Sequence, residues 1–252
     1  MERKDRIEVG LIQIATRNDD PWDAVERVID RVRGVDLIVF PELWNVGYFD
    51  FSMWIKRAEP LTGTTFMFLR DMARSLNAFV LGGSFVEKSN GRYYNTAIFI
   101  DPLGNLLGKY RKRHLLSYRS KEREILTPGV KPLVVATEIG TFGTAICYDL
   151  RFPELFREMA IQGTEVFLVP AAWPIVRMEA WEALTRARAV ENQAFLLGCD
   201  VSGKGFLGRS VVVDPEGVVI GRLGGGEGVL RAELDLAKMR AFREEFSAWR
   251  ER

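Results

Sequence analysis

Short apolar runs alternate along the chain with segments whose apolar residues recur every three or four positions. The runs at 8–15, 36–44 and 164–173 contain few polar residues, which is typical of strands buried on both faces of a sheet. Between the first two runs, apolar spacing at i, i+3, i+4 and i+7 predicts a helix that Asp20 caps and Gly34 ends. Strands that alternate with helices in this way indicate an α/β protein.

Two other stretches have a less regular pattern. Residues 44–59 are aromatic and irregular, and we expect them to form a loop near a site. Residues 78–87 predict one strand that contains Gly82-Gly83-Ser84. The glycine-rich segment 223–228 is not interpreted as a phosphate loop, because a strand follows it where a phosphate site needs a helix N-terminus.

The pattern of the first half recurs in the second. A strand–helix–strand unit ends in Phe40-Pro41-Glu42-Leu43-Trp44 and again in Val169-Pro170-Ala171-Ala172-Trp173, and a D-P-x-G hairpin turn follows each unit. The repeat predicts two mixed sheets packed face to face with helices outside, an α-β-β-α sandwich of four layers with an internal pseudo-twofold repeat. We expect one domain over residues 1–252. Glu42 corresponds to Ala171, and a carboxylate present in only one copy favours a functional role.

Composition narrows the classes of function. The 252 residues are 47% hydrophobic, which is typical of a globular protein. With 35 Lys and Arg against 34 Asp and Glu, the net charge of +1 gives no support for a nucleic-acid or membrane partner. No apolar run is long enough for a membrane span, and the charged N-terminus does not resemble a signal peptide. We therefore expect a cytoplasmic protein.

The counts of histidine and cysteine limit the chemistry. The chain has one histidine, His114, and two cysteines, Cys147 and Cys199, without a C-x-x-C pair. A histidine-rich or thiolate metal site is therefore excluded, and we expect neither a metal nor a cofactor. If Cys147 is a nucleophile, its base is either His114 or a carboxylate or amine.

Cys147 stands between a predicted strand and a predicted helix. The apolar run before it ends at the cysteine, and Pro153 marks the first position of a helix. Backbone N–H dipoles at such a place favour a thiolate and can hold an oxyanion. A lone cysteine in an apolar strand is more often a small core residue, so this stretch alone leaves both interpretations open.

Charged residues stand where other strands end. Glu42 follows a buried strand, at the position where open α/β sheets place their chemistry, although an ordinary loop carboxylate is the alternative. The basic segment 109–116 ends in Leu115-Leu116, which indicates that it turns toward the interior. At least one buried lysine then needs a carboxylate partner, which Glu122 or Glu124 could supply.

Three ordered blocks of this chain resemble the signature motifs of the nitrilase superfamily of carbon–nitrogen hydrolases. The blocks are Phe40-Pro41-Glu42-Leu43, Tyr110-Arg111-Lys112-Arg113-His114-Leu115 and Cys147-Tyr148-Asp149-Leu150-Arg151-Phe152-Pro153-Glu154. The resemblance spans nearly the whole chain and includes residues 186–193. It implies the α-β-β-α sandwich and a homodimer or larger homo-oligomer.

The resemblance also implies a Glu-Lys-Cys triad. Glu42 would take the proton of Cys147, whose thiolate attacks an amide carbon. Lys112 and the backbone N–H of Tyr148 would hold the oxyanion. His114 resembles a structural histidine of the family, and a Cys/His hydrolase is the alternative.

A second glutamate of the family orients the substrate and the lysine. Glu122 resembles it by its spacing ahead of Thr127-Pro128-Gly129. The loop that follows His114 is shorter than is common in the family, so Glu124 remains the alternative.

The substrate side of the site resembles the branch that contains omega-amidases. Trp173 and Arg177 match that branch, and Arg151 matches a position that binds the substrate carboxylate. A structural ion pair of Arg151 with Asp149 or Glu154 is the alternative.

The resemblance therefore implies a hydrolase that releases ammonia from a small carboxylate-bearing amide through a Cys thioester. One departure is Ala180, which stands where relatives often have histidine before Trp181. Hydrolysis of N-carbamoyl amino acids or amines, or of other aliphatic amides, is the alternative within this class. A non-catalytic member that binds small molecules is the alternative from another class.

Overall fold

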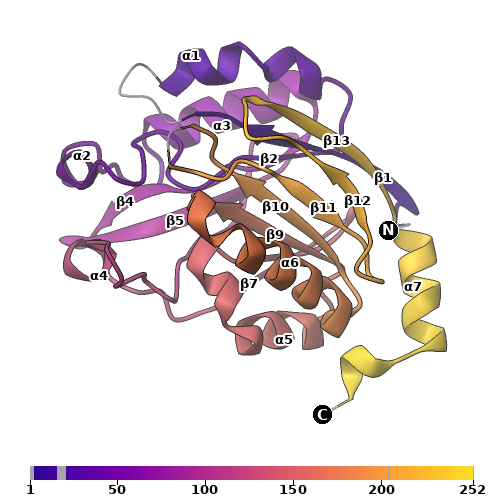
Figure 1. The fold of residues 1–252 in the computed structure, drawn as a ribbon. Helices are drawn as coiled ribbons and strands as arrows, with labels where there is room; N and C mark the ends of the chain where they lie inside the picture. Colours follow the sequence, from indigo (N-terminus) through magenta and orange to yellow (C-terminus); the bar gives the residue numbers. More distant parts are fainter. Residues whose placement is uncertain (1–2, 16–20, 204, 252) are drawn as a thin grey trace.

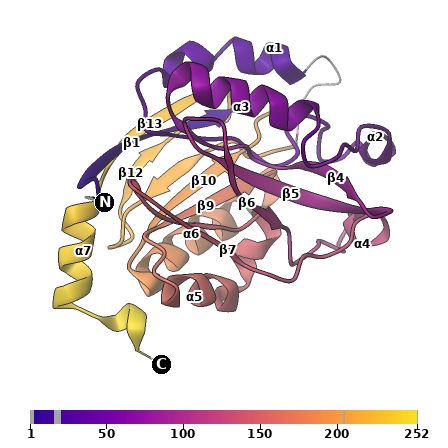
Figure 2. The same cartoon turned by 180° about the vertical axis from the view of Figure 1, so that it is seen from behind.

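The chain forms two sheets that pack face to face between two layers of helices. The computed structural model describes residues 3–15, 21–203 and 205–251. Within these residues one sheet has seven strands and the other has six, and helices cover both outer faces (Figures 1 and 2). The four-layer α-β-β-α sandwich predicted from the sequence is confirmed.

The order of strands confirms the internal repeat. The first sheet contains β13 (Gly228–Asp235), β1 (Arg6–Gln13), β2 (Leu37–Val39), β3 (Phe79–Leu81), β5 (Arg92–Ile100) and β4 (Phe85–Ser89), and β6 (Leu106–Arg111) also pairs with β5. The second contains β12 (Val219–Arg222), β11 (Val211–Val213), β10 (Phe195–Asp200), β9 (Val166–Ala171), β8 (Gly140–Thr144) and β7 (Leu133–Thr137). In both sheets three neighbouring parallel strands are followed by an antiparallel strand, β1-β2-β3-β5 in one and β8-β9-β10-β11 in the other.

The helices separate into layers and ends. The outer face of the first sheet carries α1 (Pro21–Glu26) and α3 (Thr64–Leu76), and that of the second carries α5 (Pro153–Ile161) and α6 (Met178–Asn192). The short helices α2 (Phe51–Lys56) and α4 (Glu122–Ile125) lie at one end of the sandwich, and α7 (Leu236–Glu245) lies at the other (Figure 1). None of the described helices is long and apolar enough to cross a membrane.

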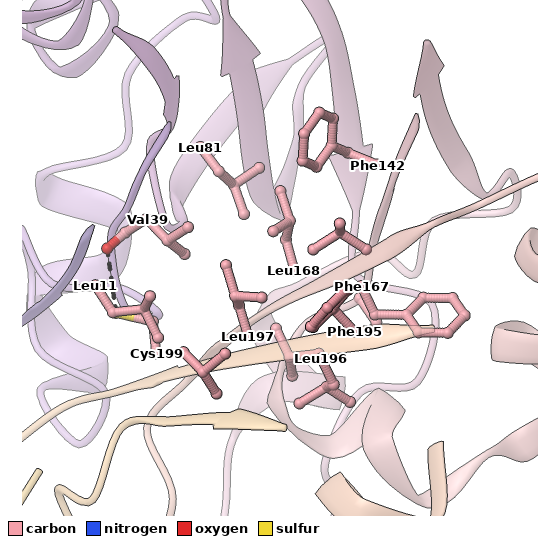
Figure 3. Close-up of a cluster of buried hydrophobic side chains, with 14 of the residues drawn as sticks. Leu11, Val39, Leu81, Phe142, Phe167, Leu168, Phe195, Leu196, Leu197 and Cys199 are labelled. Atoms are coloured by element: carbon pink, nitrogen blue, oxygen red, sulfur yellow. Dashed lines mark hydrogen bonds between the residues drawn. The ribbon is translucent and has the colours of Figure 1, made fainter. Parts of the chain in front are cut away.

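The apolar runs are continuous because both faces of the central strands are buried. Leu37 and Val39 of β2 point between the two sheets, whereas Ile38 packs on the other side with residues of α1 and α3. Figure 3 shows the core between the sheets. It includes Leu11, Val39 and Leu81 of the first sheet and Leu168, Leu197 and Cys199 of the second.

Three local expectations need correction or comment. The single strand predicted at 78–87 is two strands, because the chain leaves the sheet at Gly82-Gly83-Ser84. Gly83 has a φ of +62° there, and a Cβ on it would lie 2.1 Å from the carbonyl oxygen of Pro41. The expected loop at 44–59 contains α2. The predicted cap, Asp20, lies outside the described residues.

Candidate active site

The ends of two strands that correspond in the internal repeat, β2 and β9, lie close together between the two sheets. Glu42 lies just beyond β2, and Ala171, its counterpart, ends β9. The backbone N–H of Glu42 donates to the carbonyl of Ala171 (3.4 Å), and the N–H of Ala172 donates to Glu42 Oε2 (3.0 Å). The carboxylate that occurs in one half of the repeat is therefore held by the backbone of the other half.

Lys112 is the centre of a buried charge cluster. Its Nζ lies 2.8 Å from Glu42 Oε1 and 2.7 Å from Glu122 Oε1, and all three side chains are fully buried. Burial opposes the charge on Lys112, but the two carboxylates outweigh it and raise the pKa of Lys112 well above its usual value. Lys112 therefore remains charged. The sequence predicted that a buried lysine of this segment would need a carboxylate partner, and Lys112 has two.

Glu122, and not Glu124, is the carboxylate that meets Lys112. Glu124 is exposed on α4. Glu122 Oε2 accepts from the backbone N–H of Leu116. Burial raises the pKa of Glu122, and the nearby charge of Glu42 adds to this against the opposing effect of Lys112. One cation thus serves two carboxylates, and the cluster has an excess of negative charge.

Cys147 opens a 3₁₀ turn, Cys147–Arg151, after β8. It is buried, and its φ is +47°, an unusual value for a residue with a side chain. Burial raises the pKa of its thiol well above the usual value, and the charge of Glu42 adds to this. In the free protein, burial therefore opposes the thiolate that backbone dipoles of this turn are expected to favour. The thiol needs a base as it reacts.

The turn that begins at Cys147 is fixed by a buried carboxylate, Asp149. Its Oδ2 accepts from the backbone N–H of Ile146 (2.9 Å) and from the hydroxyl of Tyr110 (2.7 Å). Its Oδ1 lies 2.7 Å from Nδ1 of His114, whose ring stacks on Phe152 with centroids 3.6 Å apart. His114 therefore stabilises the turn through Asp149. The carboxyl group beside the Cys147 thiol is that of Glu42.

A cavity of about 560 Å³ opens beside Cys147. Among the described residues, three arginines and no Asp or Glu line it. Its walls are formed by Tyr48, Phe49, Leu116, Tyr118, Arg119, Cys147, Tyr148, Arg151, Ala172, Trp173, Pro174, Val176 and Arg177. The cavity therefore contains the nucleophile candidate, the residue whose N–H was expected to hold an oxyanion, and all three residues expected to bind substrate.

Arg151 does not form the structural ion pair considered as its alternative. No carboxylate lies within ion-pairing distance of it among the described residues, and Asp149 is bound to Tyr110 and His114. Its guanidinium lies over the ring of Trp173, 5.4 Å from the centroid. Trp173 is itself held by a bond from its indole N–H to the carbonyl of Arg177 (2.9 Å). The cation is thus available to an anionic ligand in the cavity.

Sequence reasoning missed several residues of the site. Asn95 of β5 donates to Glu42 Oε1 (2.8 Å) and to Glu122 Oε1 (3.4 Å). Tyr48 lies with its ring 5.8 Å from Lys112 Nζ. Arg188 of α6 donates to the carbonyl of Leu150 (3.0 Å) and so holds the turn that begins at Cys147. Arg188 lies in a segment that resembles the family and Tyr48 lies in the aromatic stretch expected near a site, whereas Asn95 had no signal.

No group of three or more histidine, cysteine or acidic side chains among the described residues has an arrangement that could hold a metal ion. The site is built from one thiol, one ammonium, two carboxyl groups and backbone N–H donors. Such a set can perform nucleophilic attack with proton transfer and stabilise an oxyanion.

Comparison with known proteins places this geometry in context. A family model described as Carbon-nitrogen hydrolase matches residues 8–244. A 2-oxoglutaramate amidase of Paenarthrobacter nicotinovorans is 38% identical over 263 aligned residues, which cover 98% of this chain and 90% of that protein.

Solved structures share the fold. Saccharomyces cerevisiae Nit3, a member of branch 10 of the nitrilase superfamily, aligns with a TM-score of 0.88 and 30% identity over 98% of this chain and 97% of its own. A mutant of the amidase from Nesterenkonia sp. AN1 aligns with a TM-score of 0.81 and 28% identity over 96% of this chain and 95% of its own. That structure shows covalent addition of the acetamide moiety of fluoroacetamide at its active site cysteine.

Proposed function

We propose that this chain, which belongs to the carbon–nitrogen hydrolase family and hydrolyses amides, releases ammonia from the ω-amide of a small acid with a free carboxylate. The observation that carries the proposal is the pairing of Cys147 and the buried Lys112 cluster with a cavity that three arginines line. The names of the relatives, 2-oxoglutaramate amidase and omega-amidase, support this class of substrate.

In the first half of the reaction Cys147 would be acylated. Glu42 takes the thiol proton as Sγ attacks the amide carbon, which is necessary because the thiol pKa is raised by burial. Lys112 Nζ and the backbone N–H of Tyr148 hold the oxyanion. When the tetrahedral intermediate collapses, Glu42 passes its proton to the leaving nitrogen, ammonia departs and a thioester remains.

In the second half water would cleave the thioester. Glu42 removes a proton from water, and the resulting hydroxide adds to the thioester carbonyl with the same oxyanion donors. The C–S bond breaks, the proton returns to the thiolate, and the free acid leaves. Glu122 keeps Lys112 in place through both halves, as its 2.7 Å contact supports.

At the far end of the substrate the free carboxylate would meet Arg151. Arg151 lies over Trp173 without a carboxylate partner in the described part of the chain, and Arg177 adds positive charge at the cavity wall. Replacement of Arg151 by methionine is therefore expected to raise KM for succinamate about tenfold or more, because a charged hydrogen bond is lost. Steady-state kinetics with succinamate and with a neutral amide measures this, and an equal change for both amides would contradict it.

The proposal is tested by ammonia release from succinamate, 2-oxoglutaramate, glutamine, a carbamoyl amino acid and a neutral amide. Release only from ω-amides of free acids, with loss in Cys147→Ala, supports it. Cys199→Ala is the matched control, since Cys199 is also a buried thiol but is not among the residues that line the cavity. Release from the carbamoyl or neutral compounds would contradict the substrate class. Release from none of them would favour a binding protein.

We also propose that the chain works in the cytoplasm as a homodimer or larger homo-oligomer. The resemblance of the signature blocks to the nitrilase superfamily supports this assembly. Light scattering coupled to gel filtration would measure the mass, and a monomer at assay concentration would contradict it.

A further inference from the structure

Asp200, at the end of β10, is a fully buried acid that the proposed reaction does not use. Its Oδ1 accepts from the backbone N–H of Trp173 (2.7 Å) and of Val201 (2.9 Å). Its Oδ2 has no hydrogen-bond partner in the described residues. A buried carboxyl group with one bonded and one unbonded oxygen is unusual and needs an explanation.

The segment that Asp200 holds is the one that contacts Glu42. Trp173 follows Ala172, whose N–H donates to Glu42 Oε2 (3.0 Å). Val201 in turn donates to the carbonyl of Ala171 (3.0 Å). The end of β10 therefore fixes residues 171–173 from one side, and Glu42 is bound to the other side of that segment.

The surroundings of Asp200 favour its neutral form. No cation pairs with it in the described part of the chain, and the titratable groups that face it are Glu42 and Cys199. Burial raises the pKa of Asp200 well above its usual value, and the charge of Glu42 adds to this. A neutral carboxyl group can accept two N–H bonds without placing a second charge next to Glu42.

We propose that Asp200 is a positioning residue, whose Oδ1 fixes the Ala172–Trp173 backbone so that the N–H of Ala172 holds Glu42 beside Cys147 and the Trp173 ring forms the cavity wall. The proposal rests on the proposed roles of Glu42 and Cys147. It adds a residue that lies outside the cavity and touches neither substrate nor the reacting atoms.

Three variants test this role. Asp200→Ala removes the acceptor, so kcat is expected to fall about tenfold or more, because small displacements of catalytic groups have large effects. KM should rise severalfold, since Trp173 also loses its anchor. Asp200→Asn keeps an accepting oxygen in the same place and should stay within about threefold of wild type. Asp200→Ser, with a shorter side chain that cannot reach both N–H groups, should resemble Asp200→Ala and is measured in parallel.

The rate of Cys147 alkylation by iodoacetamide gives a second measurement, followed by mass spectrometry of the labelled peptide. It needs no amide substrate, so it separates this proposal from the proposed function. If Glu42 is displaced in Asp200→Ala, alkylation of Cys147 slows about tenfold or more and Asp200→Asn restores it. If the wild-type protein released no ammonia from any amide tested, that result would contradict only the proposed function.

Ser202→Ala is the matched control. Ser202 is also buried beyond β10, and its hydroxyl has no partner among the described residues. Its kcat, KM and alkylation rate, each per titrated active site, should equal those of wild type. The proposal would be overturned if Asp200→Ala and Asp200→Ser lost only thermal stability, while kcat, KM and the alkylation rate per active site stayed as in wild type. It would also be overturned if kcat and the alkylation rate of Asp200→Asn fell as far as those of Asp200→Ala and Asp200→Ser.

Discussion

Arg111 and Lys112 are neighbours at the end of β6, yet their side chains enter two charge clusters of opposite composition. Arg111 and Lys109 point to one side of the strand, and both contact a single carboxylate, Glu87 of β4 (2.7 Å each). The hydroxyl of Thr96 donates to Glu87 as well (2.8 Å). Lys112 points to the other side, toward the second sheet.

The second cluster has the opposite ratio of cations to carboxylates. Lys112 is one cation between two carboxylates, Glu42 and Glu122. Residues 109 and 111 share a face of β6 because side chains alternate along a strand, and residue 112 therefore takes the opposite face. A step of one residue separates the two clusters.

The difference in excess charge gives the two clusters different tasks. Burial alone would raise the pKa of Glu87, but hydrogen bonds from Arg111, Lys109 and Thr96 lower it to about 2. Glu87 therefore stays ionised and stabilises the fold. In the other cluster the pKa of Glu122 is raised, because one cation cannot offset burial and a second carboxylate. This second cluster contains Glu42, which the proposed reaction uses as its base.

The largest effect is expected from removal of the central cation. Lys112→Met leaves Glu42 and Glu122 without a counter-ion and removes an oxyanion donor. We expect kcat for succinamate to fall about 10³-fold and the free energy of unfolding to drop by roughly 3–5 kcal/mol. Ammonia release and urea unfolding measure the two effects.

Lys109→Met is the matched control for that variant. It removes one of two cations from Glu87, which keeps Arg111. We expect kcat to change by less than about twofold, since Lys109 contacts Glu87 and no group of the proposed reaction. If Lys112→Met kept kcat within tenfold of wild type, the division of tasks between the clusters would be wrong.

A smaller effect separates the two glutamates of α4. Glu122→Gln keeps a hydrogen bond to Lys112 but removes the charge that orients it, so we expect kcat to fall about 10²-fold, comparable to the loss of one oxyanion donor. Glu124→Gln changes an exposed side chain and should leave kcat as in wild type. Equal activity of the two variants would return Glu124 to consideration as the second glutamate.

The smallest effect on activity is expected at Glu87. Glu87→Gln should lower the free energy of unfolding by about 2 kcal/mol at pH 7 and leave kcat per active site unchanged. The pKa of Glu87 falls from about 4.5 to about 2 on folding. Its contribution is therefore complete above about pH 4.5 and is lost as the pH falls toward 2.

Urea unfolding of wild type and Glu87→Gln at pH 7 and pH 3 measures this dependence. The difference in stability between the two proteins should narrow at the lower pH. A difference that stays constant would show that Glu87 contributes through packing and not through its charge.

Much of the site follows from strand ends, which a linear pattern reveals. Glu42 and Cys147 each come at the end of an apolar run, and Lys112 lies within a basic segment that turns inward, so their types and places were predictable. The sequence offered two carboxylate partners for Lys112, Glu122 and Glu124, but could not decide between them. The two lie half a helical turn apart, and the sequence does not fix which one is buried.

Features that depend on distant backbone were not predictable. Asp200 and Asn95 act through hydrogen bonds to segments far away in sequence, and no local pattern marks them. Asp149 lies in a signature block, but its bond to Tyr110 is likewise a long-range contact. The break after β3 arises because Gly83 meets the carbonyl of Pro41. The raised pKa of Cys147 was not predictable either, because the burial that raises it is a property of the assembled sandwich.

The central claim is that Cys147 becomes acylated while the Lys112 cluster holds the oxyanion. The most direct measurement is rapid acid quench of wild-type protein during turnover of succinamate, followed by peptide mapping by mass spectrometry. We predict a succinyl group on Cys147, none on Cys199, and no adduct in Cys147→Ala. Turnover that continues without an adduct on Cys147, or that survives in Cys147→Ala, would contradict the account.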